Sequence, residues 1–226
     1  MNKLKKHFND EAENFDEKIR KNIPRYDEML EALINAIATD KTNPKILDLG
    51  CGTGNITSKV LEKFPEAKVT CLDLSENMIK IARQKLDKYD NIEYIVDDFT
   101  KLDIKEGYDA IISSLALHHI ESDSKKLEMY KCIYDALVSG GVFYNADVIK
   151  AGSEYNKKLN EEVSHQYMID NGVSPEEIES HKSKRDANDI PITMTSHIKL
   201  LEEAGFTEID VIWKYYSNAV YGGTKK

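Results

Sequence analysis

Short apolar runs alternate along the chain with stretches whose apolar residues recur every three or four positions. The runs at residues 45–49, 67–73, 92–96, 108–115 and 142–148 are typical of buried strands. The stretches between them are typical of amphipathic helices. This repeated order of strand and helix predicts an α/β fold with a doubly wound, mostly parallel sheet and right-handed crossovers.

Two segments fall outside that repeat. In residues 1–40, apolar residues at helical spacing stop at Pro24, which predicts an N-terminal helical cap. Residues 150–190 are polar, charged and poorly periodic, and we expect them to form an inserted helical lid with a helix starting at Pro175. We predict a single domain over residues 1–226.

The first buried strand runs into three glycines at alternate positions, Gly50, Gly52 and Gly54. Glycines let the main chain approach a ligand closely, and the helix that follows offers free N–H groups to a negatively charged group. A dinucleotide fingerprint would place its third glycine at position 55, where this chain has Asn55. The spacing therefore disfavours an NAD-dependent oxidoreductase and favours another cofactor that carries a phosphate or a carboxylate.

Acidic residues follow the second and third strands. Asp73 lies roughly twenty residues after the glycines, where a carboxylate can accept hydrogen bonds from both ribose hydroxyls of an adenosine group. Capping of the next helix is the alternative for Asp73. Asp97 and Asp98 end the third strand and form either part of the same site or a solvated turn, since turns favour Asp.

Charge and cysteine content narrow the function classes. The formal net charge of −9 argues against a broad nucleic-acid surface. The cysteines Cys51, Cys71 and Cys132 include no CxxC pair, so they predict neither a disulfide framework nor a zinc site. No apolar run approaches the roughly 18 residues that span a bilayer, and no signal core follows the charged N-terminus. We expect a cytoplasmic protein that does not bind membranes.

The segment Asp48-Leu49-Gly50-Cys51-Gly52-Thr53-Gly54 resembles motif I of the class I S-adenosylmethionine-dependent methyltransferases. The resemblance continues through Asp73 and through a Gly140-Gly141 turn between a helix and the fifth strand. Residues 204–206, Ala-Gly-Phe, resemble the start of the antiparallel hairpin that completes the family's sheet. The resemblance implies a Rossmann-like seven-stranded sheet of five parallel βα units and a C-terminal antiparallel hairpin.

This resemblance also implies the contacts of S-adenosyl-L-methionine. Motif I would hold the methionine part and Asp73 the ribose. Asp98 would bind the adenine amino group beside Phe99, with Asp97 as the alternative in register. The implied cofactor contacts are Tyr26, Asp48, Gly50, Cys51, Gly52, Gly54, Asp73, Leu74, Met78, Asp98, Phe99, Ser114 and Arg185.

His118 and His119 follow the fourth strand, close to the expected methyl-transfer centre. A His side chain near pH 7 can take a proton from an acceptor hydroxyl or amine, so both are candidate catalytic residues. Packing or orienting the cofactor is the alternative role. Adjacent His side chains diverge on a helix or a strand, so we predict no shared metal site and no metal.

Arg185 lies in a charge run of the lid that is either a solvated face or a contact for an anionic acceptor or the cofactor carboxylate. Residues 20–26, motif I and the segment around Arg185 are also similar to the carboxy-S-adenosylmethionine synthase branch, which is involved in wobble-uridine modification. By that similarity Tyr26 and Arg185 would contact the cofactor, Arg185 from the partner subunit of a homodimer. Ser114 departs from this branch, which resembles Asn there.

We predict an S-adenosylmethionine-dependent methyltransferase that acts on a small-molecule acceptor. The sulfonium is already activated, so alignment of acceptor and methyl donor in a dry pocket suffices, and no catalytic triad is expected. The alternatives are a carboxy-S-adenosylmethionine synthase-like or tRNA-modification enzyme with the same cofactor site, and a non-catalytic cofactor-binding module. The acidic balance argues against an RNA acceptor unless residues 182–185 join a basic dimer surface.

Overall fold

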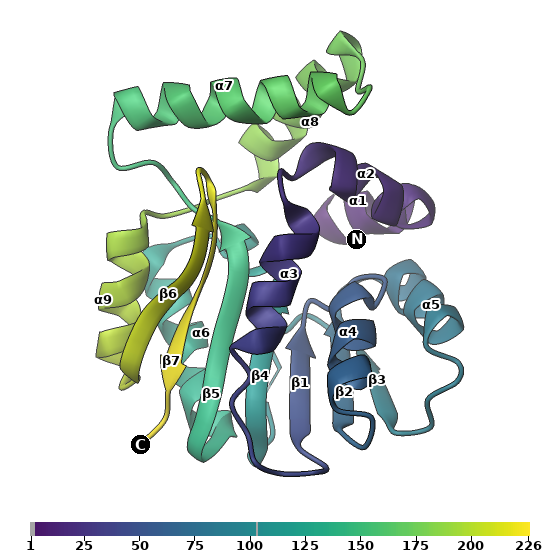
Figure 1. The fold of residues 1–226 in the computed structure, drawn as a ribbon, viewed down its shortest axis with the longest axis vertical. Helices are drawn as coiled ribbons and strands as arrows, with labels where there is room; N and C mark the ends of the chain where they lie inside the picture. Colours follow the sequence, from purple (N-terminus) through teal and green to yellow (C-terminus); the bar gives the residue numbers. More distant parts are fainter. Residues whose placement is uncertain (1–2, 103) are drawn as a thin grey trace.

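Seven strands form one mixed sheet in the order β3-β2-β1-β4-β5-β7-β6 (Figure 1). The computed structural model describes residues 3–102 and 104–226, so the first two residues of the predicted cap lie outside the described residues. Strands β1 to β5 pair in parallel, whereas β7 pairs antiparallel with β5 and β6. The predicted parallel sheet with a C-terminal antiparallel hairpin is confirmed. The strands are β1 (Lys45–Leu49), β2 (Lys68–Asp73), β3 (Ile92–Val96), β4 (Tyr108–Ser114), β5 (Leu137–Val148), β6 (Thr207–Tyr215) and β7 (Asn218–Thr224).

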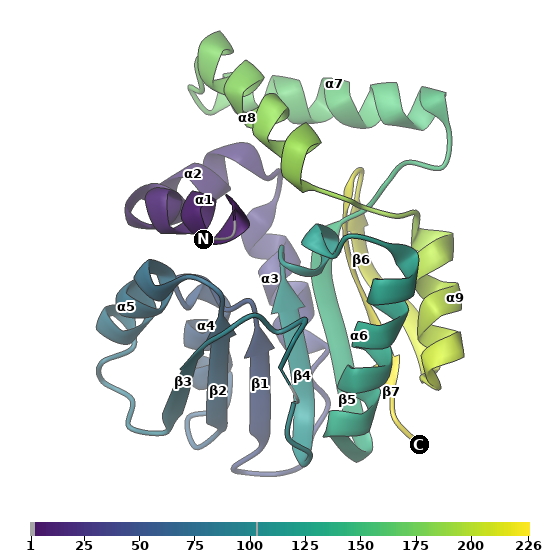
Figure 2. The same ribbon diagram turned by 180° about the vertical axis from the view of Figure 1, so that it is seen from behind.

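Helices cover both faces of the sheet and one of its ends. Figures 1 and 2 show α3 and α4 on one face and α6 and α9 on the other. Helices α1, α2, α7 and α8 lie beyond the carboxyl ends of the parallel strands. The helices are α1 (Lys3–Glu11), α2 (Phe15–Asn22), α3 (Tyr26–Asn35), α4 (Asn55–Lys63), α5 (Glu76–Lys85), α6 (Asp123–Ala136), α7 (Glu154–Asp170), α8 (Pro175–Asn188) and α9 (Met194–Ala204).

Strand β1 shows why the apolar runs form central strands. Ile46, Leu47 and Leu49 are all buried. Ile46 packs in the apolar cluster that includes α3 and α4, whereas Leu47 and Leu49 pack in the cluster that includes α6 and α9. Successive side chains of a strand point to opposite faces. A strand between two helical layers therefore requires apolar residues on both faces.

The junction between α6 and β5 differs from the prediction. The helix ends at Ala136 and the strand begins at Leu137, so Gly140 and Gly141 lie inside the strand and do not end the helix. Gly140 has φ +78°, and its N–H donates a hydrogen bond to the carbonyl oxygen of Lys225 (2.7 Å). The glycines belong to an irregular strand start, where the register of β5 against β4 shifts.

The connection from β3 to β4 also differs, since its described residues, 97–102 and 104–107, form turns and loop and no helix. Asp98 accepts hydrogen bonds from the N–H and the hydroxyl of Thr100, and Lys101 donates another. Such local bonds compete with helical hydrogen bonds. The chain therefore turns sharply where β3 ends.

The helical spacing predicted in the cap is interrupted by a 3-10 turn at Ala12–Asn14, which separates α1 from α2. The predicted helix start at Pro175 is confirmed for α8. Ser174 and Glu177 form a capping box there, with each side chain bonded to the other residue's N–H.

The cap and the lid contact each other over the strand ends. The hydroxyl of Tyr167 in α7 donates a hydrogen bond to the carbonyl oxygen of Arg20 (2.8 Å). Lys184 of α8 forms an ion pair with Glu11 of α1 (2.5 Å). Both contacts join residues far apart in the sequence, so cap and lid together enclose the space above the carboxyl ends of the strands.

We expect Gly222→Ala to destabilise the sheet. Gly222 pairs with Tyr144 across β7 and β5, and a Cβ on it would clash with the carbonyl oxygen of Phe143 and lie 2.6 Å from the Tyr144 ring. Relief requires the strands to separate, and overpacking of this kind costs about 1–3 kcal/mol or more in the free energy of unfolding. Urea unfolding measures the loss. Gly152→Ala, whose Cβ would meet open space, is the control, and equal stability of both variants would contradict the packing.

Candidate functional site

A cavity of about 470 Å³ lies at the carboxyl ends of β1 to β4. It brings together most of the site residues predicted from sequence, which come from separate parts of the chain. The predicted residues that line it are Tyr26, Asp48, Gly50, Cys51, Gly52, Asp73, Leu74, Met78, Asp98, Phe99, Ser114 and His119. Gly54, His118 and Arg185 are described by the structure but do not line this cavity. We call it the cofactor cavity.

The three motif I glycines have different surroundings. All have positive φ, at +72° for Gly50, +53° for Gly52 and +81° for Gly54. A Cβ on Gly52 would meet nothing within 4 Å, which leaves open space at the cavity wall for a ligand. A Cβ on Gly54 would lie 2.9 Å from Leu86 of the neighbouring helical layer. Gly54 therefore serves the packing of α4, and its predicted cofactor contact has no support from the cavity lining.

Asp73 is fixed at the end of β2 by two main-chain donors. The N–H of Gly52 donates to Oδ2 and the N–H of Ser75 donates to Oδ1, both at 2.8 Å. Burial raises the pKa of Asp73, although both hydrogen bonds oppose the rise. Ser75, and not Asp73, caps α5, because its side chain accepts the hydrogen bond from Met78. The capping alternative for Asp73 is therefore wrong, and each carboxylate oxygen keeps acceptor capacity for a ligand.

Asp48 carries an unsatisfied acceptor at the cavity wall. Its Oδ2 accepts a hydrogen bond from the hydroxyl of Thr57 (2.6 Å), whereas Oδ1 has no partner among the described residues. Burial raises the pKa of Asp48 to about 7. A buried oxygen without a partner costs free energy, so a ligand that donates a hydrogen bond or carries a positive charge would be favoured beside it.

The structure resolves the register at the end of β3. Asp98 and Phe99 line the cofactor cavity, whereas Asp97 is exposed and does not. Burial alone would raise the pKa of Asp98. Hydrogen bonds from Lys101 and Thr100 outweigh burial and hold this pKa below its usual value. Asp98 is therefore ionised at neutral pH and oriented at the cavity rim.

A polar cluster missed by the sequence analysis joins the cap to the motif I turn. Asp16 of α2 accepts hydrogen bonds from the hydroxyl of Thr53 (2.5 Å) and the amide of Asn55 (2.9 Å). Lys85 of α5 pairs with Asp16 (2.5 Å) and also donates to Thr53 and Asn55. These partners lie far apart in the sequence, so no local pattern could reveal them. The cluster holds Phe15, which neighbours Asp16, over the cofactor cavity.

A second cavity, of about 500 Å³, lies between the cap, the lid and the turn after β4. Phe8, Phe15, Leu115 and His119 line both this cavity and the cofactor cavity. We call it the lid groove. Arg185 lines the lid groove, and its guanidinium has no hydrogen-bond or ion-pair partner among the described residues.

Glu11 links the cap to the lid at the edge of the lid groove. Its carboxylate pairs with Lys18 of α2 at 2.7 Å and with Lys184 of α8 at 2.5 Å. Burial alone would raise the pKa of Glu11. The two ammonium groups outweigh burial and lower this pKa from 4.5 to about 2. Ion pairs through Glu11 therefore form a bridge between the cap and the lid at the edge of the groove.

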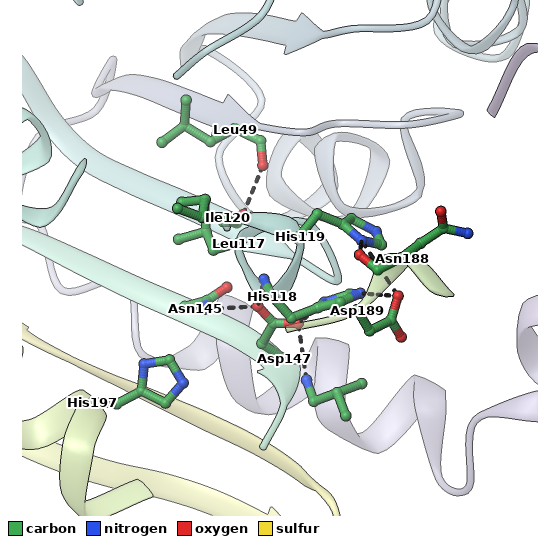
Figure 3. A network of polar contacts seen from close by, with 12 residues as sticks. Leu49, Leu117, His118, His119, Ile120, Asn145, Asp147, Asn188, Asp189 and His197 are labelled. Carbon is green, nitrogen blue, oxygen red and sulfur yellow. Dashed lines mark hydrogen bonds and ion pairs between the residues drawn. The ribbon is translucent and has the colours of Figure 1, made fainter. Parts of the chain in front are cut away.

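His118 and Asp147 form a buried pair (Figure 3), and His118 also lines the lid groove. Nδ1 of His118 lies 2.5 Å from Oδ1 of Asp147, whose Oδ2 accepts the hydrogen bond of the His118 N–H (3.0 Å). Burial alone would lower the pKa of His118. The carboxylate of Asp147 outweighs burial and raises this pKa. Asp147 lies near the end of β5, and its carboxylate is directed to the imidazole and the N–H of His118.

His118 and His119 lie side by side, which corrects the expectation of diverging rings. They belong to a 3-10 turn at Leu117–His119, and their ring centroids are 4.0 Å apart. Adjacent side chains diverge on a regular helix or strand, but these two residues lie on neither. Burial, and then the charge of His118, lower the pKa of His119 to about 3. His119 is therefore neutral at physiological pH.

Comparisons with known proteins identify the family of the chain. A family model described as a methyltransferase domain matches residues 46–141. The chain is 31% identical over 215 residues to a carboxy-S-adenosyl-L-methionine synthase of Nautilia profundicola, a match that covers 93% of this chain and 90% of the relative. No helix in the described part of the chain is long and apolar enough to cross a membrane.

Solved structures share the fold at lower sequence identity. A DhpI complex with SAM and HEP superposes with a TM-score of 0.66 at 17% identity, covering 96% of this chain and 94% of that one. Human N-acetylserotonin methyltransferase in complex with SAM superposes with a TM-score of 0.59 at 19% identity, covering 87% of this chain and 51% of that one.

We expect Gly52→Ala to weaken the binding of S-adenosylhomocysteine strongly. Its loss of stability should be close to that of Gly172→Ala. A methyl group at position 52 would enter the open space at the cavity wall. Gly172→Ala is a matched control, because Gly172 also has positive φ (+76°) and open space but lies in the lid. Calorimetry measures binding and thermal unfolding measures stability. Equal binding by both variants would show that the ligand does not approach Gly52.

We expect Glu11→Gln to lower the unfolding temperature at neutral pH, with an effect that disappears in acid. A carboxylate with a lowered pKa stabilises the folded state above its unfolded pKa of 4.5, and this contribution is lost as pH falls towards about 2. Because solvent screens the two lysine side chains, which are 51% and 47% exposed, the effect is below about 1 kcal/mol. Thermal unfolding between neutral and acid pH tests this against Glu13→Gln, an exposed neighbour. A difference that does not change with pH would contradict the assignment.

Proposed function

Because the chain belongs to the class I S-adenosylmethionine-dependent methyltransferases, we propose that it methylates a small molecule held between the cap and the lid. The observation that carries the proposal is the wall shared by the two cavities. Phe15, Leu115 and His119 line both the cofactor cavity and the lid groove. A methyl donor in the first cavity and an acceptor in the second would meet across these residues.

The cofactor cavity fits S-adenosyl-L-methionine. The free Oδ1 of Asp48 suits the ammonium group of the cofactor, and the open space at Gly52 suits its methionine part. Asp73 would accept the ribose hydroxyls, and Asp98 with Phe99 would hold the adenine. When bound, the cofactor supplies an activated methyl group on its sulfonium sulfur.

The protein's contribution would be alignment and exclusion of water. Phe8 and Phe15 of the cap cover the junction between the cavities, where their rings would keep water from the reacting groups. Holding two reactants in line can account for a large part of the rate gain in a transfer of this kind. His119, with a pKa of about 3, is a weak base, so we propose that it positions the acceptor, while His118 remains a predicted catalytic residue.

Arg185 favours an acceptor with a negatively charged group. Arg185 lines the lid groove and has no hydrogen-bond or ion-pair partner within residues 3–102 and 104–226, whereas Lys184 is paired with Glu11. A forked donor of this kind binds a carboxylate through two parallel hydrogen bonds. We therefore propose a small carboxylic acid as the acceptor class.

The experiment that tests this proposal is a screen of small carboxylic acids, phenols, amines and thiols with S-adenosyl-L-methionine. We expect release of S-adenosylhomocysteine with an acid, abolished binding of cofactor in Asp73→Ala, and at least a tenfold higher KM for the acid in Arg185→Gln, about 1.4 kcal/mol of lost binding. Lys182→Gln is the control, since Lys182 is exposed on the same helix and does not line the groove. Turnover that needs no acid group, or an Arg185→Gln enzyme with unchanged KM, would reject the acceptor class.

A second candidate is synthesis of carboxy-S-adenosylmethionine. The similarity to the Nautilia profundicola synthase extends over 93% of this chain, including the cap and the lid, and so supports this activity. Ser114, where that branch resembles Asn, is the departure. Incubation with S-adenosyl-L-methionine and prephenate, followed by mass spectrometry of the cofactor, decides between the two. A carboxylated cofactor would replace methyl transfer as the proposed reaction.

We also propose a cytoplasmic homodimer. The cysteines Cys51, Cys71 and Cys132 are all free thiols in the described chain, which suits a reducing compartment. Tyr155 and Ile169 are large apolar side chains exposed on α7, where a second copy could cover them. Light scattering on the purified protein would reveal a monomer if the dimer is wrong.

A further inference from the structure

His118, His119 and Asp189 form a cluster of metal-binding groups at the end of the lid (Figure 3). We propose that this cluster binds a divalent transition-metal cation, with Zn²⁺ as the ion that fits it best. One ligand atom from each residue lies within 4.8 Å of the others. All three residues line the lid groove, so an ion could enter from there.

The separations between the Asp189 oxygen and the two histidine nitrogens are close to those of a tetrahedral site. Oδ1 of Asp189 lies 3.6 Å from Nε2 of His118 and 3.4 Å from Nδ1 of His119. Zinc ligands about 2.0–2.1 Å from the ion, at tetrahedral angles, lie about 3.3–3.4 Å from one another. The ligand atoms of the two histidines lie within 4.8 Å of each other, and side-chain movement would bring them to the tetrahedral distance around an ion. Two imidazoles and one carboxylate leave a fourth position open, as in zinc sites that bind a further ligand.

Asp147 supplies the second-shell hydrogen bond that metal-binding histidines normally have. Its carboxylate lies 2.5 Å from Nδ1 of His118, which places the proton on Nδ1 and leaves the lone pair of Nε2 directed towards Asp189. Asp147 is fully buried, and Asn145 and the N–H of Val148 also donate to it. The tautomer and ring orientation of His118 are thus set before any ion arrives.

The charges around the cluster favour a cation. The charged groups that act on the cluster are the acids Asp147, Asp186 and Asp189 and the bases Lys126 and Arg185. The ammonium group of Lys126 donates to the carbonyl oxygens of Leu117 and Ile120. When the imidazoles are neutral, as metal binding requires, these three acids and two bases leave one net negative charge at the cluster. A divalent ion would compensate it.

Ion binding requires one rearrangement at His119. Nδ1 of His119 lies 3.2 Å from the carbonyl oxygen of Asn188, a contact in which the nitrogen donates. To bind a metal, that nitrogen must lose its proton and the hydrogen bond, with the proton moving to Nε2. A neutral imidazole can carry its proton on either nitrogen. Moving the proton therefore costs little free energy compared with the gain from a metal–nitrogen bond.

The open position gives the site a role that rests on the proposed function. His119 lines both cavities, so an ion beside it would lie next to the shared wall. There it could hold an oxygen of the acceptor, and Arg185 could bind a second charged group of the same molecule. Metal binding itself does not depend on this role.

The test is calorimetric titration of Zn²⁺ into the chelator-treated full chain. We expect one ion per chain in the wild type and in His165→Gln, a control that removes an exposed histidine of α7. Asp147→Asn should weaken binding about 10- to 100-fold, and Asp189→Asn and His119→Gln should weaken it more, since they remove ligands. Substitution with Co²⁺ should give the visible absorption bands of tetrahedral coordination.

Folding is controlled by measuring S-adenosylhomocysteine binding in Asp189→Asn, whose side chain lies outside the cofactor cavity. Absence of one-to-one Zn²⁺ binding in the wild type would overturn the proposal. Equal Zn²⁺ affinity of wild type and Asp189→Asn would also overturn it. A protein that binds Zn²⁺ at this cluster but shows no methyl transfer would reject the proposed acceptor chemistry and leave the metal site standing.

Discussion

The turn after β1 is fastened to the end of β2 by main-chain hydrogen bonds, and the cofactor cavity depends on them. The N–H groups of Gly50 and Cys51 both donate to the carbonyl oxygen of Leu72, at 2.8 and 3.1 Å, and the N–H of Gly52 donates to Asp73. These bonds require left-handed backbone at both glycines, which residues with a Cβ adopt only with strain. The turn thus fixes the two strand ends against each other, and Asp48, Asp73 and Asp98 reach one cavity as a consequence.

The buried pair of His118 and Asp147 performs a comparable task at the end of β4. It joins the turn after β4 to β5, and the N–H of Ile190 donates to the carbonyl oxygen of His118 (2.8 Å), which anchors the end of the lid as well. Removing one partner of this buried pair leaves the other without its hydrogen bond, at a cost of about 1–3 kcal/mol. The turn after β4 and the end of the lid at Ile190 are therefore both attached to the central sheet.

The sequence predicts the parts of this site that depend on local order. Apolar runs specify the strands, and glycines or acids directly after a strand must lie at the carboxyl edge of a parallel sheet. It fails where contacts join distant segments, as in the bond between Asp16 and Thr53, for which each residue alone carries no signal. It also fails where a short turn replaces regular structure. The sequence predicts diverging rings for His118 and His119, whereas a 3-10 turn brings them together.

The lid differs from the rest of the molecule in what holds it. Within the described residues of α7 and α8, only Met168 and Ile178 are buried apolar side chains, and the contacts to the cap are polar. Segments with few buried apolar contacts open at low free energy compared with the core. In the proposed reaction an acceptor would enter the lid groove, which Phe8 and Phe15 line, and a weakly held lid suits this entry. Because its ion-pair bridge through Glu11 is screened by salt, ionic strength should act on acceptor entry more than on the cofactor cavity.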